Sequence, residues 1–204
     1  MRHIARRLGR NAGNLFLEWR YPQLRVAFGI RSHLTHKERI TLYLLARSTP
    51  LVVEIGAYLG ASSCCFGAAR IPQGAGRVIC IDTWANDAMS EGRRDTWQEF
   101  NDNTRPYSDC IVPVRGFSVD VLASVRREIS HVDLLFIDGD HAYESVKADW
   151  DAYKPFLRSG STVVFHDYGW AEGVRRVVHE DVACLVDRSD RLPNMWWGRI
   201  GRLD

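Results

Sequence analysis

Short apolar runs and helix-like segments alternate along most of the chain, and this alternation limits the fold more than any other feature. Seven runs predict strands, at 51–55, 77–82, 110–114, 132–138, 161–166, 182–187 and 194–200. Helical patterns lie between them at 61–70, 92–103, 118–128, 142–157 and 171–180. The first five runs are almost wholly apolar, which is typical of parallel strands that are buried on both faces. The pattern predicts an α/β fold in which helices connect the strands of a mostly parallel sheet.

The two ends of the chain depart from that alternation. No helical pattern separates the last two strands, which are joined across 188–193. Parallel neighbours need a crossover of about a dozen residues, so this pair predicts an antiparallel hairpin. At the other end, Thr35 and Glu38 form a T-x-x-E capping box that starts a predicted helix over 35–47. We expect a main domain over 35–204 and an N-terminal helical extension over 1–34, which serves as a lid, a dimer contact or a frayed end.

The composition excludes several classes of protein. A length of 204 residues suits one domain with an extension, and a net charge of +2 gives little support to nucleic-acid binding. No apolar run approaches the roughly 20 residues that span a bilayer, so no membrane contact is expected. The five cysteines include no C-x-x-C pair, which predicts reduced thiols in a cytoplasmic protein.

A glycine-containing loop follows the first predicted strand. Open α/β sheets bind ligands at the carboxyl ends of their strands, and the segment there runs from Gly56 to Gly60. Glycines allow a tight turn and close approach of a ligand, and the next helix presents free N–H groups. An ordinary strand-to-helix turn has the same composition, so the loop alone does not decide the function.

Two further residues narrow the choice of cofactor. Tyr58 stands where the dinucleotide fingerprint G-x-G-x-x-G has its middle glycine. Asp82 ends the second strand, where a carboxylate can accept hydrogen bonds from both hydroxyls of a ribose. Tyr58 therefore argues against an NAD-linked oxidoreductase, and together with Asp82 it favours a ribose-bearing cofactor without a diphosphate.

Acidic and histidine side chains follow the fourth and fifth predicted strands, which are neighbours in this topology. They are Asp138, Asp140, His141, His166 and Asp167. Grouped carboxylates suit a hard divalent ion such as Mg²⁺, and a histidine ligand broadens the choice toward Mn²⁺. Such an ion makes a bound hydroxyl more acidic, and a nearby histidine can take its proton. Asp140 is equally explained as a cap of the helix that follows.

These motifs together resemble the class I S-adenosylmethionine-dependent O-methyltransferases. The similar segments are GAYLGASS, Asp82-Thr83-Trp84, GFSVD and FIDGDH, within about residues 50–170. They are closest to the catechol-type and macrolide-sugar-type enzymes of that class. The resemblance implies a Rossmann-like, doubly wound sheet and S-adenosylmethionine as cofactor. The cofactor-binding residues that we expect are Glu54, Gly56, Tyr58, Gly60, Ser62, Asp82, Thr83, Trp84, Ser118 and Asp138.

The resemblance also implies roles for the acidic and histidine residues. His141 takes the position of the catalytic base, and Asp138 and Asp167 match metal-binding carboxylates. Tyr168 replaces the asparagine that is the third metal ligand in catechol-type enzymes, which leaves His166 or Asp140 as the substitute. His166 is also a second candidate for the base. Ser118 is expected beside the adenine or as a helix N-cap, and Trp84 beside the ligand or in the core.

The acceptor is less constrained than the cofactor. The long polar stretch over 83–109, together with the resemblance, favours a sugar hydroxyl over a phenolic or catechol hydroxyl. The alternatives are an NAD-linked oxidoreductase, a metal-dependent hydrolase and a catalytically silent subunit that acts through protein contacts. We expect a homodimer, since the extension must bury its apolar residues. The helix over 142–157 is expected to place Asp149 on a solvated face and Trp150, Tyr153 and Phe156 in the core.

Overall fold

A seven-stranded sheet forms the centre of the described part of the chain. The computed structural model describes residues 12–70, 74, 76–86 and 92–201. The strand order is β3-β2-β1-β4-β5-β7-β6. The strands are β1 (Leu51–Ile55), β2 (Arg77–Asp82), β3 (Ile111–Arg115), β4 (Val132–Ile137), β5 (Leu157–His166), β6 (Val186–Leu192) and β7 (Met195–Ile200). Strand β7 runs antiparallel to both β5 and β6, and the other pairings are parallel. The predicted sheet, with one antiparallel strand near the C-terminus, is confirmed.

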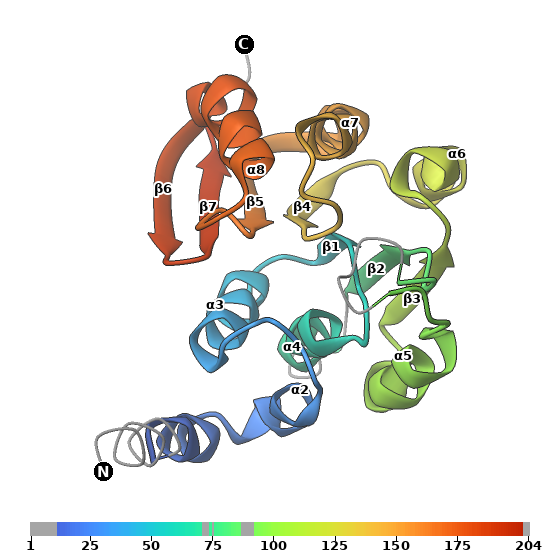
Figure 1. Ribbon diagram of the computed structural model, residues 1–204, viewed down its shortest axis with the longest axis vertical. Helices are drawn as coiled ribbons and strands as arrows, with labels where there is room; N and C mark the ends of the chain where they lie inside the picture. Colours follow the sequence, from blue (N-terminus) through green and yellow to red (C-terminus); the bar gives the residue numbers. More distant parts are fainter. Residues whose placement is uncertain (1–11, 71–73, 75, 87–91, 202–204) are drawn as a thin grey trace.

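Helices cover both faces of this sheet (Figure 1). One face carries α2 (Arg25–Gly29), α3 (His36–Ala46), α4 (Ala61–Arg70) and α5 (Trp97–Thr104), and the other carries α6 (Ser118–Glu128), α7 (Tyr143–Tyr153) and α8 (Glu172–Val177). Each layer of helices buries its own apolar cluster against the sheet. Phe66 of α4 packs against Phe136 of β4 on one side, and Trp150 of α7 packs against Phe165 of β5 on the other. The two clusters make this the doubly wound arrangement that the sequence predicts.

Local sequence signals account for several element boundaries. The capping box at the start of α3 is present, with Thr35 N–H donating to Glu38 Oε2 at 2.7 Å and Glu38 N–H donating to Thr35 Oγ1 at 3.3 Å. Helix α5 begins at Trp97, five residues later than predicted. Short helices follow α5 and α7, namely η3 (Arg105–Tyr107) and η4 (Lys154–Phe156), each with a proline in its first turn.

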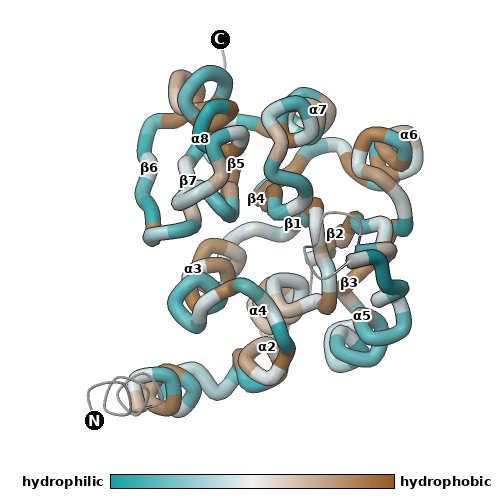
Figure 2. Tube along the Cα trace, in the orientation of Figure 1, coloured by the Kyte–Doolittle hydropathy of each residue, from teal (hydrophilic) through white to brown (hydrophobic). Residues whose placement is uncertain are grey.

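The strand predicted over 182–187 is wrong. Residues Val178–Val182 form a π-helical turn and Ala183–Leu185 a 3-10 turn, so that strand β6 begins only at Val186. Val182 is β-branched and apolar, as in a strand, but it is fully buried as part of this helical segment. The true strand has the sequence VDRSDRL and lies at the edge of the sheet, where it appears hydrophilic in Figure 2. Edge strands carry polar and charged side chains, which removes the apolar signal.

The described residues of the N-terminal segment are largely helical. Residues 12–20 form one helix, and η1 (Pro22–Leu24) leads into α2. Leu24, Ala27 and Leu34 are buried in the same cluster as α4, so this part of the chain contributes to the core. Residues 1–11 of the expected extension lie outside the described residues. Within the described residues, no helix combines the length and apolar character that a membrane span needs.

Candidate functional site

The glycine loop after β1 is shaped by close contacts with neighbouring elements. Gly56 has φ = +88°, and a Cβ there would lie 2.1 Å from the carbonyl oxygen of Asp138. Gly60 has φ = +87°, and a Cβ there would lie 2.6 Å from Thr104 Cγ2. Only glycine combines this backbone conformation with such close approach. Gly56 therefore lets the loop meet the end of β4, whereas Gly60 lets it pack beside α5.

Asp82 joins the glycine loop to the segment that follows β2. Its Oδ2 accepts the Tyr58 N–H at 2.8 Å, and its Oδ1 accepts the Trp84 N–H at 2.6 Å. The indole N–H of Trp84 in turn donates to the Tyr58 carbonyl at 3.0 Å. Trp84 is fully buried against Trp97 and Phe100. The Asp82 carboxylate is thus oriented by backbone donors, while Trp84 is a core residue.

A first cavity, of about 580 Å³, opens at the carboxyl ends of β1 to β4. Six of the expected cofactor-binding residues line it, namely Gly56, Tyr58, Asp82, Thr83, Ser118 and Asp138. The cavity is also bordered by one side of α7, including Ser145, Ala148 and Asp149. Glu54, Gly60 and Trp84 line neither this cavity nor the one described below.

Asp149 is buried, which corrects the expectation of a solvated face. Its side chain is 7% exposed, and its Oδ1 accepts the hydroxyl of Ser118. Burial raises the pKa of Asp149 to about 6, although the Ser118 hydrogen bond opposes the shift. Trp150, Tyr153 and Phe156 of the same segment are buried as predicted.

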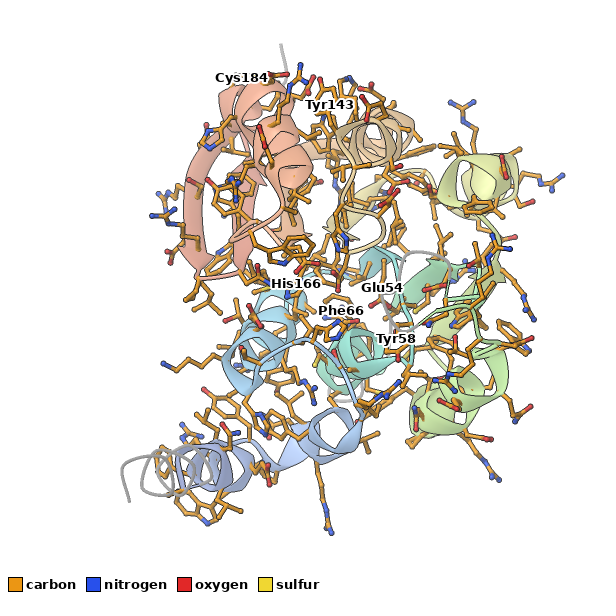
Figure 3. The ribbon with its side chains drawn as sticks, in the orientation of Figure 1. Glu54, Tyr58, Phe66, Tyr143, His166 and Cys184 are labelled. Atoms are coloured by element: carbon orange, nitrogen blue, oxygen red, sulfur yellow. The ribbon has the colours of Figure 1, made fainter. Side chains whose placement is uncertain are left out.

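Glu54 lies under the glycine loop rather than in a cavity. Its side chain is fully buried, and its Oε2 accepts the hydroxyl of Ser63. Its Oε1 has no hydrogen-bond partner among the described residues. Burial raises the pKa of Glu54 to about 7. Figure 3 shows Glu54, Tyr58 and His166 near the middle of the molecule, between the two layers of helices.

A second cavity, of about 410 Å³, adjoins the first. The two share Gly56, Tyr58, Asp138 and Gly139. The second is further lined by residues from five parts of the chain, including Ser32, His33, Ser62, His141, His166, Asp167, Trp170 and Asn194. The expected cofactor residues therefore lie mainly in one space and the expected catalytic residues in the other, with Asp138 at the boundary.

The acidic and histidine residues form a connected network at the boundary and in the second cavity. His141 Nε2 lies 2.7 Å from Asp167 Oδ2, and His166 Nδ1 lies 2.9 Å from Asp138 Oδ1. Asp167 Oδ1 accepts the indole N–H of Trp170 at 2.8 Å. Asp167 has φ = +57°, a left-handed conformation that Asp tolerates better than most residues. The network holds the carboxylate of Asp167 in one orientation beside His141.

The imidazole and carboxylate groups of this network shift one another's pKa values. Burial alone lowers the pKa of His166, but the charge of Asp138 and hydrogen bonds to Asp138 and Asp167 outweigh it and raise the pKa to about 12. The hydrogen bond to Asp167 raises the pKa of His141 as well. Burial opposes ionisation of Asp167, yet hydrogen bonds from both histidines hold its pKa well below its usual range.

The donor atoms of Asp138, His166 and Asp167 lie within 4.8 Å of one another. The set fits a divalent cation through its two carboxylates. From the described part of the chain, Asp138 Oδ1 and Asp167 Oδ2 each accept one hydrogen bond, which leaves a lone pair on each oxygen. His166 becomes a ligand only by giving up its proton, since Nδ1 is engaged with Asp138. Two carboxylates and an imidazole are donors that Mg²⁺ or Mn²⁺ accepts.

Two of the other candidates lie away from the network. Asp140 Oδ1 accepts the backbone N–H of His141 at 2.6 Å, and its Oδ2 accepts the Ser145 hydroxyl at 2.7 Å. These contacts hold the loop before α7, but Asp140 is not the expected helix cap, because the N-cap of α7 is Ala142 and no described side chain caps that helix. The Tyr168 hydroxyl lies 3.1 Å from His179 Nε2 rather than facing the carboxylates.

The sequence did not point to Asn194, which reaches the network from the turn between β6 and β7. Its Nδ2 donates to Asp167 Oδ1 at 2.8 Å, and its Oδ1 accepts the Gly169 N–H at 3.2 Å. Ser32 and His33 were also missed, because the N-terminal segment has no recognisable motif. The Pro193-Asn194 pair was a turn signal, but no local pattern places that turn beside β5.

Comparison with known proteins places this geometry in a family. Residues 53–168 match the family model described as a methyltransferase domain. The protein y4gI of Sinorhizobium fredii is 32% identical over 118 residues, which are 57% of this chain and 13% of y4gI, so the chain spans only a small part of that relative.

Two solved structures share the fold at 18% sequence identity. The O-methyltransferase TomG of Streptomyces achromogenes, in complex with S-adenosylmethionine, has a TM-score of 0.66, with 91% of this chain and 89% of TomG covered. The TDP-rhamnose 3'-O-methyltransferase CalS11 has a TM-score of 0.60, with 80% and 77% covered. The match to the family model extends over more than half of the chain and includes the four residues that the two cavities share. The chain therefore belongs to the methyltransferase domain family.

Proposed function

We propose that the protein transfers the methyl group of S-adenosylmethionine to a hydroxyl group of a small molecule. The observation that carries the proposal is the pair of cavities that meet at Gly56, Tyr58, Asp138 and Gly139. A methyl donor in the first cavity and an acceptor in the second would face each other at this boundary. Such an arrangement holds two reactants in line, which is a large part of what a transferase contributes.

The first cavity suits a nucleoside with a short charged tail. Asp82 and Ser118 line its wall, and so does Tyr58, which stands where the dinucleotide fingerprint has a glycine that lets a pyrophosphate approach. Bound S-adenosylmethionine supplies an electrophilic methyl group. The chain's contribution there is to orient this molecule, and we assign that role to the cofactor residues that line the cavity.

His141 is the proposed general base. In the neutral ring, an Nε2–H that donates to Asp167 Oδ2 leaves Nδ1 as the proton acceptor. Nδ1 makes no hydrogen bond to a described residue. The base is therefore oriented by Asp167 while its second nitrogen is available to an acceptor hydroxyl. His166 is less suited, because its ring is 1% exposed and engaged with Asp138.

A divalent metal, which we propose to be Mg²⁺, would be held by Asp138 and Asp167, with His166 as a further donor. When bound, it would make the acceptor hydroxyl more acidic. The residues of the chain would then position that hydroxyl beside His141.

The proposed acceptor is a sugar or saccharide hydroxyl. Support comes from the shared fold of CalS11, a TDP-rhamnose 3'-O-methyltransferase, and from the exposed indole ring of Trp170 at the second cavity. Aromatic rings also bind phenols, so a phenolic or catechol hydroxyl is the alternative. A silent subunit is the alternative of another class, and the intact network of His141, Asp167 and Asp138 argues against it.

We also propose a cytoplasmic homodimer whose partners are small molecules and that binds neither nucleic acid nor membrane. All five cysteines are unpaired, which suits a reducing compartment. The net charge of +2 offers no strong attraction to polyanions.

The decisive test is calorimetric titration with S-adenosylmethionine and with NAD, each with and without Mg²⁺. Micromolar binding of S-adenosylmethionine, with no heat from NAD, is the expected result and would justify a screen of sugar and phenolic hydroxyls for methyl transfer. Heat from Mg²⁺ alone, abolished in Asp167→Asn, would support the metal site. If S-adenosylmethionine does not bind under any condition, the proposed activity is wrong and protein partners become the next subject.

A further inference from the structure

Asp149 is a buried carboxylate whose location is not explained by any ion pair. It lies on α7, it is 7% exposed, and no described lysine, arginine or histidine forms a salt bridge with it. Removing a charged group from water without a partner is costly. The side chain nevertheless lines the first cavity. A ligand in that cavity would give the carboxylate a function that the protein's own contacts do not.

The two carboxylate oxygens of Asp149 have different surroundings. Oδ1 accepts a hydrogen bond from the hydroxyl of Ser118. The backbone carbonyl of Ser118 in turn accepts a hydrogen bond from the Tyr153 hydroxyl at 2.9 Å. No described residue donates to Oδ2, and Oδ2 lies 3.6 Å from the position that a Cβ on Gly139 would take. Gly139 also lines the cavity, so the absence of a side chain there leaves space beside Oδ2. Oδ2 is therefore an acceptor that is positioned for a donor in the cavity.

The chemistry of this acceptor selects the ligand's donor. A carboxylate accepts hydrogen bonds and, when ionised, donates none. With a pKa of about 6, Asp149 is ionised at neutral pH. Ile81, Phe117 and Val119 line the same cavity and offer apolar surface for a flat ring. An amino group on the edge of such a ring meets both requirements, whereas a carbonyl oxygen there would repel the carboxylate.

We propose that Asp149 recognises the exocyclic amino group of the adenine ring and so selects a 6-aminopurine over a 6-oxopurine. The inference rests on the proposed function, since it assumes that S-adenosylmethionine occupies the first cavity. It assigns the selectivity for the purine ring to α7, a helix on which the sequence predicted Asp149 to be exposed to solvent. Ser118 acts through Asp149, because its hydroxyl fixes the orientation of the carboxylate.

The test compares S-adenosylhomocysteine with its deaminated analogue, S-inosylhomocysteine, by calorimetry on the full chain. Wild type is expected to bind the adenosyl compound at least ~100-fold more tightly, because a site built around a hydrogen bond rejects a ligand that cannot make it. In Asp149→Asn, the amide can donate to the 6-oxo group, and the ratio should fall below about tenfold. Asp151→Asn is the matched control, since Asp151 is exposed on the same helix and pairs with Lys147 and Lys154.

A second measurement does not depend on any variant. The N6,N6-dimethyl form of S-adenosylhomocysteine lacks both amino hydrogens and should bind wild type at least ~10-fold more weakly than the parent compound. Two results would each overturn the role of Asp149 without affecting the proposed function. One is equal wild-type affinity for the dimethyl and parent compounds. The other is an Asp149→Asn variant that keeps the wild-type ratio of affinities for the adenosyl and inosyl compounds. If wild type binds no S-adenosylhomocysteine at all, the proposed function fails and this inference fails with it.

Discussion

At the scale of single residues, His141 is the side chain whose removal should separate chemistry from binding. It lines the second cavity and not the first. His141→Ala should therefore lower turnover by ~10²–10⁴, the usual contribution of a general base, and change the affinity for S-adenosylmethionine by less than about twofold. Steady-state rates and calorimetry measure the two quantities. His131→Ala, at a half-buried site outside both cavities, is the control. A parallel loss of cofactor affinity would show that His141 is misassigned.

Glu54 leads to a prediction about stability and pH. Burial raises its pKa from 4.5 to about 7, so the folded state binds the proton more tightly than the unfolded state between these values. Below pH 4.5 both states are protonated and there is no penalty. As pH rises toward 7, the folded state loses stability, by up to about 3 kcal/mol for a shift of this size. Glu54→Gln has no charge to bury, so its stability relative to wild type should increase from pH 5 to pH 8.

Urea unfolding at pH 5 and pH 8 measures that difference in the free energy of unfolding. Glu128→Gln is a suitable comparison, because Glu128 is 57% exposed and pairs with Arg77 at the surface. Its stability relative to wild type should change little between the two pH values. If Glu54→Gln behaves in the same way, the Glu54 carboxyl is not buried in the manner described.

At the scale of secondary-structure elements, predictability follows burial. The central strands β1 and β2 were predicted to the residue, because strands covered on both faces are continuous apolar runs. Helix α4 was also predicted to its ends, since a glycine loop precedes it and every residue of it is buried. Strand β6 was placed four residues too early, because an exposed edge strand has no such run. Apolar pattern thus identifies the centre of the sheet and fails at its edge.

The candidate site shows the same division. Residues at strand ends or within a few positions after them could be found from the sequence, because the sheet brings strand ends together; they are Asp82, Asp138, His141 and Asp167. Asn194 and Asp149 could not. Asn194 depends on how the β6–β7 turn packs beside β5, and Asp149 depends on the rotation of α7 about its axis. Both are set by tertiary packing, which a local pattern does not encode.

The β6–β7 turn gives a prediction at this scale. Asn194 bridges the turn to the loop after β5, through Asp167 Oδ1 and the Gly169 N–H. Asn194→Ala removes a donor to a charged acceptor, an interaction of about 1.5–3 kcal/mol, so Asp167 should hold His141 less firmly. Turnover should fall by ~10-fold, with no change in affinity for S-adenosylhomocysteine. Ser189→Ala, exposed in the same hairpin, should match wild type. Equal turnover in both variants would remove Asn194 from the site.

At the scale of the whole molecule, the site depends on segments from the entire described chain. The second cavity takes Ser32 from the N-terminal segment and Asn194 from the last hairpin, with the strand ends between them. The N-terminal segment also enters the core through Leu24 and Ala27. The same segment thus contributes both to the core and to the wall of the cavity in which we propose that the acceptor binds. At the start of this segment, the helix over 12–20 extends beyond the sheet and the helices that cover it (Figure 1).

That helix supplies the argument for a homodimer. Leu15, Phe16 and Trp19 are 63%, 60% and 75% exposed, and the rings of Phe16 and Trp19 lie 5.9 Å apart. Residues three or four positions apart, such as Phe16 and Trp19 or Leu15 and Trp19, lie on the same face of a helix. Large exposed apolar side chains grouped in this way favour contact with another protein surface. In a two-fold symmetric dimer the same face of each copy is covered by the other copy, so one contact would bury this face on both chains.

Sedimentation equilibrium should therefore find a dimer at micromolar concentration, and the double variant Leu15→Ser, Trp19→Ser should be monomeric. Leu44→Ser controls for the loss of an exposed leucine, because Leu44 is 45% exposed on α3. Association stabilises the folded state by mass action, so the melting temperature of wild type should rise with protein concentration while that of the double variant should not. A wild type that sediments as a monomer would exclude the homodimer. A double variant that remains dimeric would instead assign the contact to another face.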